Sequence, residues 1–226
     1  MHDVACDSCR VLQAAGASTV CAVLDMLGVG GIVAGIPLRG AGGAYAGPAY
    51  TVKAVVGPLG TYAPADFDIP AYVDRPEPGS VVAIDAGGAA VSLAGGIAAR
   101  ASALRSVRGW VVDGGMRDGD ELCDAGIPLH VRHVVPVSGR TRVRIEATQV
   151  PITIAGVTVR PGDILVGDET GVGCVPREVV ETVAKMADWI RERDGVAAAL
   201  VEQGRPFKEA FAAATAQVES QRGPLA

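Results

Sequence analysis

The sequence has few aromatic residues, few cysteines and no long apolar run, and each shortage excludes a class of protein. Phe, Trp and Tyr make up 4% of the 226 residues, and the cysteines are five, an odd and scattered set. That set does not suit the disulfide framework of a small secreted domain. No segment approaches the roughly 20 apolar residues of a membrane-spanning helix, and the N-terminus, MHDVACDSCR, does not resemble a signal peptide. We therefore expect a cytoplasmic protein with no membrane segment.

An excess of basic residues is also missing. Twenty Lys and Arg stand against 25 Asp and Glu, a formal charge of -5, which argues against a nucleic-acid partner. What the chain has in plenty is glycine (30) and proline (14), within a composition that is 49% hydrophobic. Such a chain folds, and it contains many tight turns and places where backbone approaches backbone or a ligand closely.

Apolar periodicity predicts alternating strands and helices, which is an α/β fold in one domain. We expect residues 1–17 to form an N-terminal segment open to disorder, 18–215 to form the domain with its C-terminal helices, and 216–226 to form a tail. The predicted strands are Ala49–Val56, Val81–Asp85, Gly109–Val112, Leu129–Val137 and Val150–Val159. The predicted helices are Thr19–Leu27 with Ser18 as N-cap, Gly96–Arg105, Gly119–Ala125, Glu178–Arg193, Val196–Gln203 and Pro206–Thr215.

One segment of the chain repeats another. PGSVVAID begins at Pro78 and PGDILVGD begins at Pro161, and in each an aspartate, Asp85 or Asp168, follows the proline by seven positions. Pro-Gly favours a type II turn, in which glycine takes the positive φ angle. The repeat predicts two similar turn–strand units within one sheet system.

The densest cluster of chemically useful residues is VDGGMRD, directly after the strand GWVV. It places Arg117 and Asp118 at the carboxyl end of a strand, where α/β proteins bind ligands. A competing interpretation is structural: Asp118 and Glu121 have the spacing of a helix capping box. A second candidate is Gly95-Gly96-Ile97 at the start of a helix, where backbone N–H groups can hold a carboxylate.

A zinc site is a weaker alternative. Cys6 and Cys9 have the spacing of metal ligands, and His130 and His133 could complete a set. The two histidines fall on opposite faces of the predicted strand, which does not suit shared ligation. We expect Cys6 and Cys9 to be thiols at a frayed end.

Several segments in order resemble the RraA-like family, which includes 4-hydroxy-4-methyl-2-oxoglutarate aldolase/oxaloacetate decarboxylase enzymes and regulators of ribonuclease E. These segments are STVCAVLDMLG, YTVKAV, PGSVVAIDAGG, GWVVDGGMRDGDEL and VRPGDILVGDETGVGCVP. The resemblance implies a swivelling β/β/α domain in a homo-trimer or homo-hexamer, with active sites between subunits. For the enzymes, it implies a small 2-oxo acid substrate and a divalent metal, Mg²⁺ or Mn²⁺.

The resemblance also assigns roles to residues. Arg117 would contact the substrate and stabilise a pyruvate enolate, Asp118 would hold the metal, and the amides of Gly95, Gly96 and Ile97 would bind the substrate carboxylate. Glu192 or Asp194 would reach a neighbouring subunit's site, and Arg140 or Arg142 would supply a basic group.

One position departs from the family's enzymes. They carry an acidic residue 21 positions before the motif arginine, and here that position is Gly96. Asp85 and Asp113 are candidate replacements. The sequence thus predicts a metal-dependent lyase, diverged at Gly96, with two alternatives: a non-catalytic oligomeric regulator or binding protein of the RraA type, or a relative recruited to another reaction on a similar acid.

Overall fold

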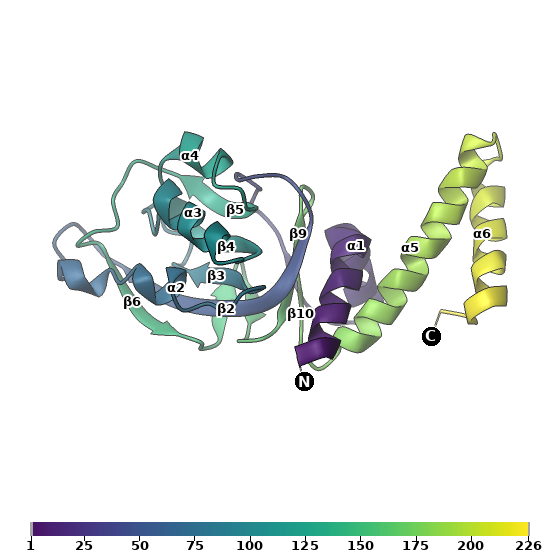
Figure 1. Cartoon of the computed structure of the whole chain (residues 1–226), viewed down its shortest axis with the longest axis horizontal. Helices are drawn as coiled ribbons and strands as arrows, with labels where there is room; N and C mark the ends of the chain where they lie inside the picture. The colour runs from purple at the N-terminus through teal and green to yellow at the C-terminus, as the bar shows by residue number, and fades with distance from the viewer. Residues whose placement is uncertain (1, 226) are drawn as a thin grey trace.

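The computed structural model describes residues 2–225, with side chains for residues 7–225, and its centre is a sheet of the order β1-β10-β9-β2-β3-β4-β5 (Figure 1). The strands are β1 (Ile32–Val33), β2 (Tyr45–Val56), β3 (Val81–Asp85), β4 (Gly109–Met116), β5 (Leu129–Val134), β6 (Val143–Thr148), β9 (Ile164–Asp168) and β10 (Gly171–Val175). Strands β2 to β5 are parallel, and β6 pairs with β2 off this path. A separate hairpin consists of β7 (Ile152–Ile154) and β8 (Val157–Val159).

Helices cover the sheet and extend beyond it. They are α1 (His2–Met26), the 3-10 turn η1 (Pro64–Asp66), α2 (Pro70–Val73), α3 (Gly96–Leu104), α4 (Gly119–Cys123), α5 (Val180–Glu202) and α6 (Phe207–Arg222). In Figure 1, α2, α3 and α4 lie over the parallel strands, while α5 passes α1 and projects from the body with α6 beside it. Among residues 2–225, no helix has the length and apolar character needed to cross a membrane.

Alternation along the parallel strands builds two cores. In β3, Val82 and Ile84 pack into the core beneath α2 and α3, whereas Val81 and Ala83 face a second core shared with the β7–β8 hairpin. A period of two residues places successive side chains on opposite faces of a sheet, so both faces of β3 are buried. A third core joins α1 and α5 to β9 and β10. The predicted single α/β domain with C-terminal helices is confirmed.

The repeated segments form two strands of this one sheet. Gly79 and Gly162, each before its strand, have φ angles of 87° and 83°, as the Pro-Gly turn requires. The strands that follow, β3 and β9, are the two neighbours of β2 in the strand order. The sequence repeat therefore marks the strands on either side of the longest strand.

The N-terminal helix is longer than the sequence predicts. It runs from His2, with a break at Gly16 (φ 79°, ψ 164°), instead of beginning at Thr19. Leu12 is fully buried and Cys9 is 4% exposed, so the described side chains of this segment pack in the core with α5. Burial of these apolar residues explains why the expected frayed, disordered segment is helical here; the side chain of Cys6 lies outside the described residues.

The structure differs from the sequence predictions at other places as well. Val150–Val159 is a hairpin, because Ala155 and Gly156 both take positive φ angles and turn the chain back. Strand β6 was not predicted. The two helices predicted before and after Gly195 are one helix, α5, because a single helical glycine costs only about 1 kcal/mol.

Candidate active site

Arg117 and Asp118 lie at the carboxyl end of β4, where the parallel strand ends. Asp118 has left-handed backbone angles (φ 61°, ψ 54°) and makes no side-chain capping hydrogen bond to α4. The capping-box interpretation of Asp118 and Glu121 is therefore wrong. The Arg117 Nε lies 3.4 Å from Asp118 Oδ2, and the two side chains are 52% and 36% exposed, so both remain accessible to a ligand.

Gly95 is held against this pair by backbone pairing. The N–H of Arg117 donates to the carbonyl of Ala94 at 3.0 Å, and Leu93 N–H donates to Gly115 O at 2.8 Å. A Cβ at Gly95 would overlap Asp118 Oδ2 and lie 3.1 Å from Arg117 Cγ. Gly95 has φ -134°, so this glycine is needed for space and not for an unusual conformation.

The start of α3 is open because its N-cap, Gly95, has no side chain with which to cap the first amides. Ile97, in the first turn, is 82% exposed. Backbone N–H groups at the N-terminus of a helix attract anions. The structure thus brings the expected carboxylate-binding segment, residues 95–97, beside Arg117 and Asp118.

Three cavities meet at Arg117. One of about 400 Å³ contains Arg117 and Asp118, one of about 500 Å³ contains Arg117, Gly95 and Arg140, and one of about 250 Å³ contains Arg117, Asp118 and Asp74. Of the two basic candidates, Arg140 therefore shares a cavity with Arg117. Arg142 is not among the residues of these cavities; it donates to Ser138 O at 3.1 Å.

Glu121 is a site residue that sequence reasoning treated only as a capping partner. A Cβ at Gly96 would overlap the Cβ and Oε2 of Glu121 and lie 3.1 Å from its Cδ. Glu121 is exposed, and its carboxylate has no hydrogen-bond or ion-pair partner among the described residues. Its position beside Gly96 results from the packing of α4 on α3, a contact that no local sequence pattern contains.

Asp85 and Asp113, the two candidate replacements for the missing acid, are committed to holding the β7–β8 hairpin. Asp85 accepts hydrogen bonds from Lys53 Nζ (2.7 Å) and Thr153 N–H (3.1 Å). Asp113 accepts from Arg132 Nε (2.5 Å) and from the N–H of Ala155 (2.6 Å). Both side chains are buried, and neither lines a cavity that contains Arg117.

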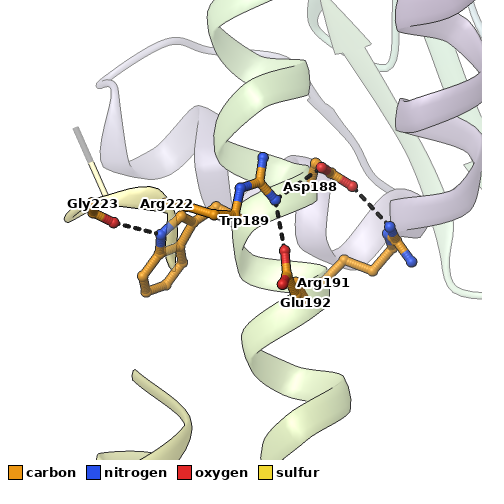
Figure 2. Close-up of polar contacts among 6 residues, drawn as sticks. All are labelled: Asp188, Trp189, Arg191, Glu192, Arg222 and Gly223. Atoms are coloured by element: carbon orange, nitrogen blue, oxygen red, sulfur yellow. Dashed lines mark hydrogen bonds and ion pairs between the residues drawn. The ribbon is translucent and has the colours of Figure 1, made fainter. Parts of the chain in front are cut away.

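Glu192 and Asp194 lie on α5, which projects away from α3 and α4 (Figure 1). Figure 2 shows Arg222, at the end of α6, bridging Asp188 and Glu192 at 2.9 Å each, while Trp189 Nε1 donates to Gly223 O. Hydrogen bonds from Arg191 and then Arg222 lower the pKa of Asp188. Asp194 pairs with Arg193. Within one chain these carboxylates do not join the Arg117 site.

The two histidines on β5 serve the fold. His130 is fully buried, with Nδ1 2.8 Å from Tyr45 Oη and Nε2 3.0 Å from Asp168 O. His133 Nε2 lies 3.0 Å from Gly88 O. In the described part of the chain, no three His, Cys, Asp or Glu side chains are grouped to hold a metal; the side chain of Cys6, which belongs to the alternative zinc site, lies outside that part.

A hard divalent cation fits the donors at Asp118 better than zinc does. Asp118 Oδ2 lies against Gly95, and Glu121 Oε2 lies against Gly96, where no Cβ could fit. Mg²⁺ takes one or two protein carboxylates and keeps several waters, so it does not need a set of three protein ligands. Asp118 and a water shell satisfy that requirement.

A larger cavity, of about 890 Å³, lies elsewhere, between α1, residues 32–40 and the β9–β10 turn. It contains Cys21 and Arg39 but neither Arg117 nor Asp118. Burial, with smaller contributions from Asp25 and Asp168, raises the pKa of the Cys21 thiol, which favours its protonated form. The size of a cavity therefore does not identify the candidate active site, because this larger cavity contains neither Arg117 nor Asp118.

Comparison with known proteins identifies the family of the chain. The RraA-like (Aldolase/RraA) family model matches residues 18–173. Protein DlpA of Legionella pneumophila is 32% identical over 146 residues, which are 64% of this chain and 23% of that protein. The 4-hydroxy-4-methyl-2-oxoglutarate aldolase of Thermus thermophilus is 34% identical over 99 residues, 43% of this chain and 60% of that protein. The alignments thus span less than two thirds of these relatives.

Solved structures share the fold over most of the chain. Streptomyces coelicolor RraAS2, described as an unusual member of the RNase ES inhibitor RraA family, superposes with a TM-score of 0.70 at 25% identity, covering 80% of this chain and 90% of that one. An uncharacterized protein from Pseudomonas syringae gives 0.76 at 26% identity, covering 85% and 90%. The chain belongs to the RraA-like family.

Proposed function

We propose that the chain is a divalent-metal-dependent lyase that cleaves a small 2-oxo acid, by retro-aldol reaction or decarboxylation, through a pyruvate enolate. The observation that carries this proposal is the exposed Arg117–Asp118 pair beside the open N-terminus of α3. Anion-binding amides, a guanidinium and a carboxylate meet there around shared cavities. A site for pure protein binding has no evident use for that combination.

The residues have complementary tasks toward a 2-oxo acid. The amides of residues 95–97 bind the substrate carboxylate. The Arg117 guanidinium donates hydrogen bonds to the keto oxygen, and these strengthen as that oxygen gains negative charge in the transition state. Asp118 would hold Mg²⁺ or Mn²⁺, which when bound adds positive charge near the same oxygen. The nearby Arg140 offers a second cation for the tail of the substrate.

A homo-oligomer, trimer or hexamer, is part of the proposal. Ile97 and Leu104 are 82% and 84% exposed on α3, the helix that begins at the site. Large apolar side chains this exposed favour a surface that a neighbouring subunit covers. A neighbour could then bring Glu192 or Asp194 to the site, which α5 of the same chain does not.

The second candidate is a non-catalytic regulator of the RraA type. Two observations favour it: the solved RraAS2 structure is named for RNase ES inhibition, and Gly96 stands where the resembled enzymes carry an acid. A third candidate, another reaction on a similar acid, would use the same Arg117 and amides. Activity measurements separate the three.

The testing experiment measures pyruvate release from oxaloacetate and from a 4-hydroxy-2-oxo acid, with Mg²⁺ or Mn²⁺ and then with excess chelator. The expected result is turnover above the rate of the free metal that disappears on chelation. Turnover no faster than the metal alone would favour the regulator. Turnover that survives chelation would contradict metal dependence.

A further inference from the structure

One of the three cavities at Arg117 does not contain the candidate metal ligand. The cavities of about 400 Å³ and 250 Å³ both contain Asp118, whereas the cavity of about 500 Å³ contains Arg117 and Gly95 without Asp118. A metal held by Asp118, with its water shell, would lie on the side of the first two cavities. The third cavity is then left for the part of a substrate that extends beyond its keto group, and we call it the tail cavity.

One wall of the tail cavity is apolar. It consists of η1 and the residues after it, and its side chains are all hydrocarbon: Pro64, Ala65, Phe67 and Ile69. The opposite wall comes from residues just before α3 and from residues 138–140. None of the described residues that line the cavity is Asp or Glu, so a cationic tail would have no partner there.

The ring of Phe67 is built into the apolar wall. A Cβ at Gly139 would overlap Ser92 O and lie 2.7 Å from Phe67 Cζ, so the edge of the ring lies where Gly139 has no side chain. Gly139 is buried and does not have a positive φ, which means that space and not conformation requires the glycine. Phe67 also packs against the core beneath α2 and α3, so its ring is a fixed surface of the cavity.

Backbone hydrogen bonds join the two walls. Before η1, the N–H of Gly60 donates to Thr141 Oγ1 at 3.3 Å and the N–H of Tyr62 donates to Thr141 O at 3.2 Å. The start of η1 is held by Asp66 Oδ2, which accepts from Ala63 N–H at 2.8 Å. The tail cavity is therefore formed before a ligand binds, which lowers the free-energy cost of binding.

Ile69 is the apolar side chain nearest to the reacting part of the site. Besides the tail cavity, it lines the cavity of about 250 Å³, where Val73 and Ile97 continue the apolar surface. The other residues that line both cavities are Gly95 and Arg117. Ile69 therefore meets the first atoms of a tail, and Phe67 meets the atoms farther along.

Arg140, the cation of the tail cavity besides Arg117, suits an aromatic tail. An arginine guanidinium attracts the face of an aromatic ring, and Arg140 is exposed at the cavity. A carboxylate tail would lose water against Phe67 and Ile69, which offer it no hydrogen bond. An uncharged ring satisfies both the hydrocarbon wall and the guanidinium.

We propose that Phe67 and Ile69 determine the specificity of the proposed lyase, and that its substrate is a 4-hydroxy-2-oxo acid with an aryl group at C4; this inference rests on the proposed function. The aryl group lies in the tail cavity. In the cleavage the C3–C4 bond breaks, the C4 hydroxyl loses its proton, and C4 becomes the carbonyl of an aromatic aldehyde. The electron pair passes to the C2 oxygen, and the enolate takes up a proton at C3 to give pyruvate.

The first test compares two substrates that differ only in the group on C4. They are 4-hydroxy-2-oxo-4-phenylbutanoate and 4-hydroxy-2-oxoglutarate, which has a carboxylate in place of the phenyl group. We expect the wild-type kcat/KM to be about tenfold or more higher for the phenyl substrate, the usual scale of discrimination in an apolar pocket. An equal or higher kcat/KM for the carboxylate substrate would overturn the inference and leave the proposed function standing.

Variants then test the wall itself. Ala65→Trp fills the tail cavity from an exposed position, and Ala63→Trp adds the same side chain at an exposed residue that does not line it. The readout is the ratio of kcat/KM for the phenyl substrate to that for oxaloacetate, because a loss of folded protein lowers both values equally. Ala65→Trp, Phe67→Ala and Ile69→Ala should each lower this ratio about tenfold, and Ala63→Trp should not. An unchanged ratio in the three cavity variants would overturn the inference.

Binding of analogues that cannot be cleaved separates this inference from the proposed function. 2-Oxo-4-phenylbutanoate and 2-oxoglutarate lack the C4 hydroxyl, so retro-aldol cleavage cannot occur. By calorimetry with Mg²⁺ present, the wild type should bind the phenyl analogue about tenfold more tightly, and Phe67→Ala should lose that preference. A wild type with this preference that cleaves no substrate would refute the lyase and keep the aryl-binding cavity. A wild type that binds neither analogue would overturn the inference.

Discussion

The carboxylate of Asp168 accepts a hydrogen bond from the backbone N–H of Ala17 at 2.8 Å, where α1 restarts after its break at Gly16. Its other oxygen accepts from Thr170 N–H at 2.8 Å. Asp168 thus supplies the N-cap that the sequence assigns to Ser18, and it ties α1 to the β9–β10 turn. The cap comes from a residue distant in sequence because the helix break faces the sheet.

Replacing this cap should destabilise the fold. We expect Asp168→Ala to lower the free energy of unfolding by about 1–2 kcal/mol, the usual range for losing a helix N-cap. Urea denaturation followed by circular dichroism measures the change. Asp168→Asn keeps an acceptor oxygen and should recover more than half of the loss; equal losses in the two variants would argue that charge, not capping, is what matters.

Asp113 should prove structural. Asp113→Ala leaves Arg132 without its partner and removes one of the two aspartates that hold the β7–β8 hairpin. We therefore expect the free energy of unfolding to fall by about 3 kcal/mol. Lyase turnover per folded molecule should stay within a fewfold of wild type. Asp120→Ala, an exposed aspartate, serves as the stability control. A stable but inactive Asp113→Ala would make Asp113 a catalytic acid.

Asp118 should show a conflict between stability and activity. Its left-handed backbone is unfavourable for a residue with a Cβ, so Asp118→Gly should raise the free energy of unfolding by about 0.5–1 kcal/mol. The same variant should lose Mn²⁺ binding and lyase turnover. Thermal unfolding and the turnover assay check the two halves; a less stable Asp118→Gly would show that the carboxylate supports the fold.

His130 should make stability depend on pH. Burial lowers its pKa, against a smaller opposing effect of Asp168, so His130 is neutral when folded. Because Asp168 O can only accept, Nε2 carries the proton and Nδ1 accepts from Tyr45 Oη.

The sign of the effect follows from linkage. The unfolded chain takes up a proton at His130 as pH falls below the usual histidine pKa, whereas the folded chain resists it, so stability falls with decreasing pH. Urea midpoints at pH 7.5 and 5.0 measure the loss. His130→Gln, which cannot titrate, should show a smaller loss; an identical pH response would assign it to other groups.

The features that the sequence predicts correctly are those that depend on adjacent residues. The two Pro-Gly turns and the strands after them follow from a glycine that must take positive φ and from an apolar run. The position of Arg117 and Asp118 at a strand end follows from the pattern GWVV before them. A short stretch of sequence is enough to predict each of these features.

The features that were missed depend on distant contacts. Asp118 and Glu121 have capping-box spacing, but the left-handed backbone at Asp118 turns its side chain away from that role. Gly95-Gly96 resembles an ordinary turn, and nothing local reveals that Asp118 and Glu121 fill the space beside it. Likewise, Asp85 and Asp113 accept hydrogen bonds from the backbone of the β7–β8 hairpin, which is distant from both in sequence.

The most direct test of the central claim is the effect of Arg117→Ala on pyruvate release from oxaloacetate in the presence of Mg²⁺. Since Arg117 is assigned to the charge that develops on the keto oxygen, turnover should fall about 10²-fold or more. Arg177→Ala removes an exposed arginine outside the three cavities and should leave turnover unchanged. Wild-type turnover in Arg117→Ala would contradict the account.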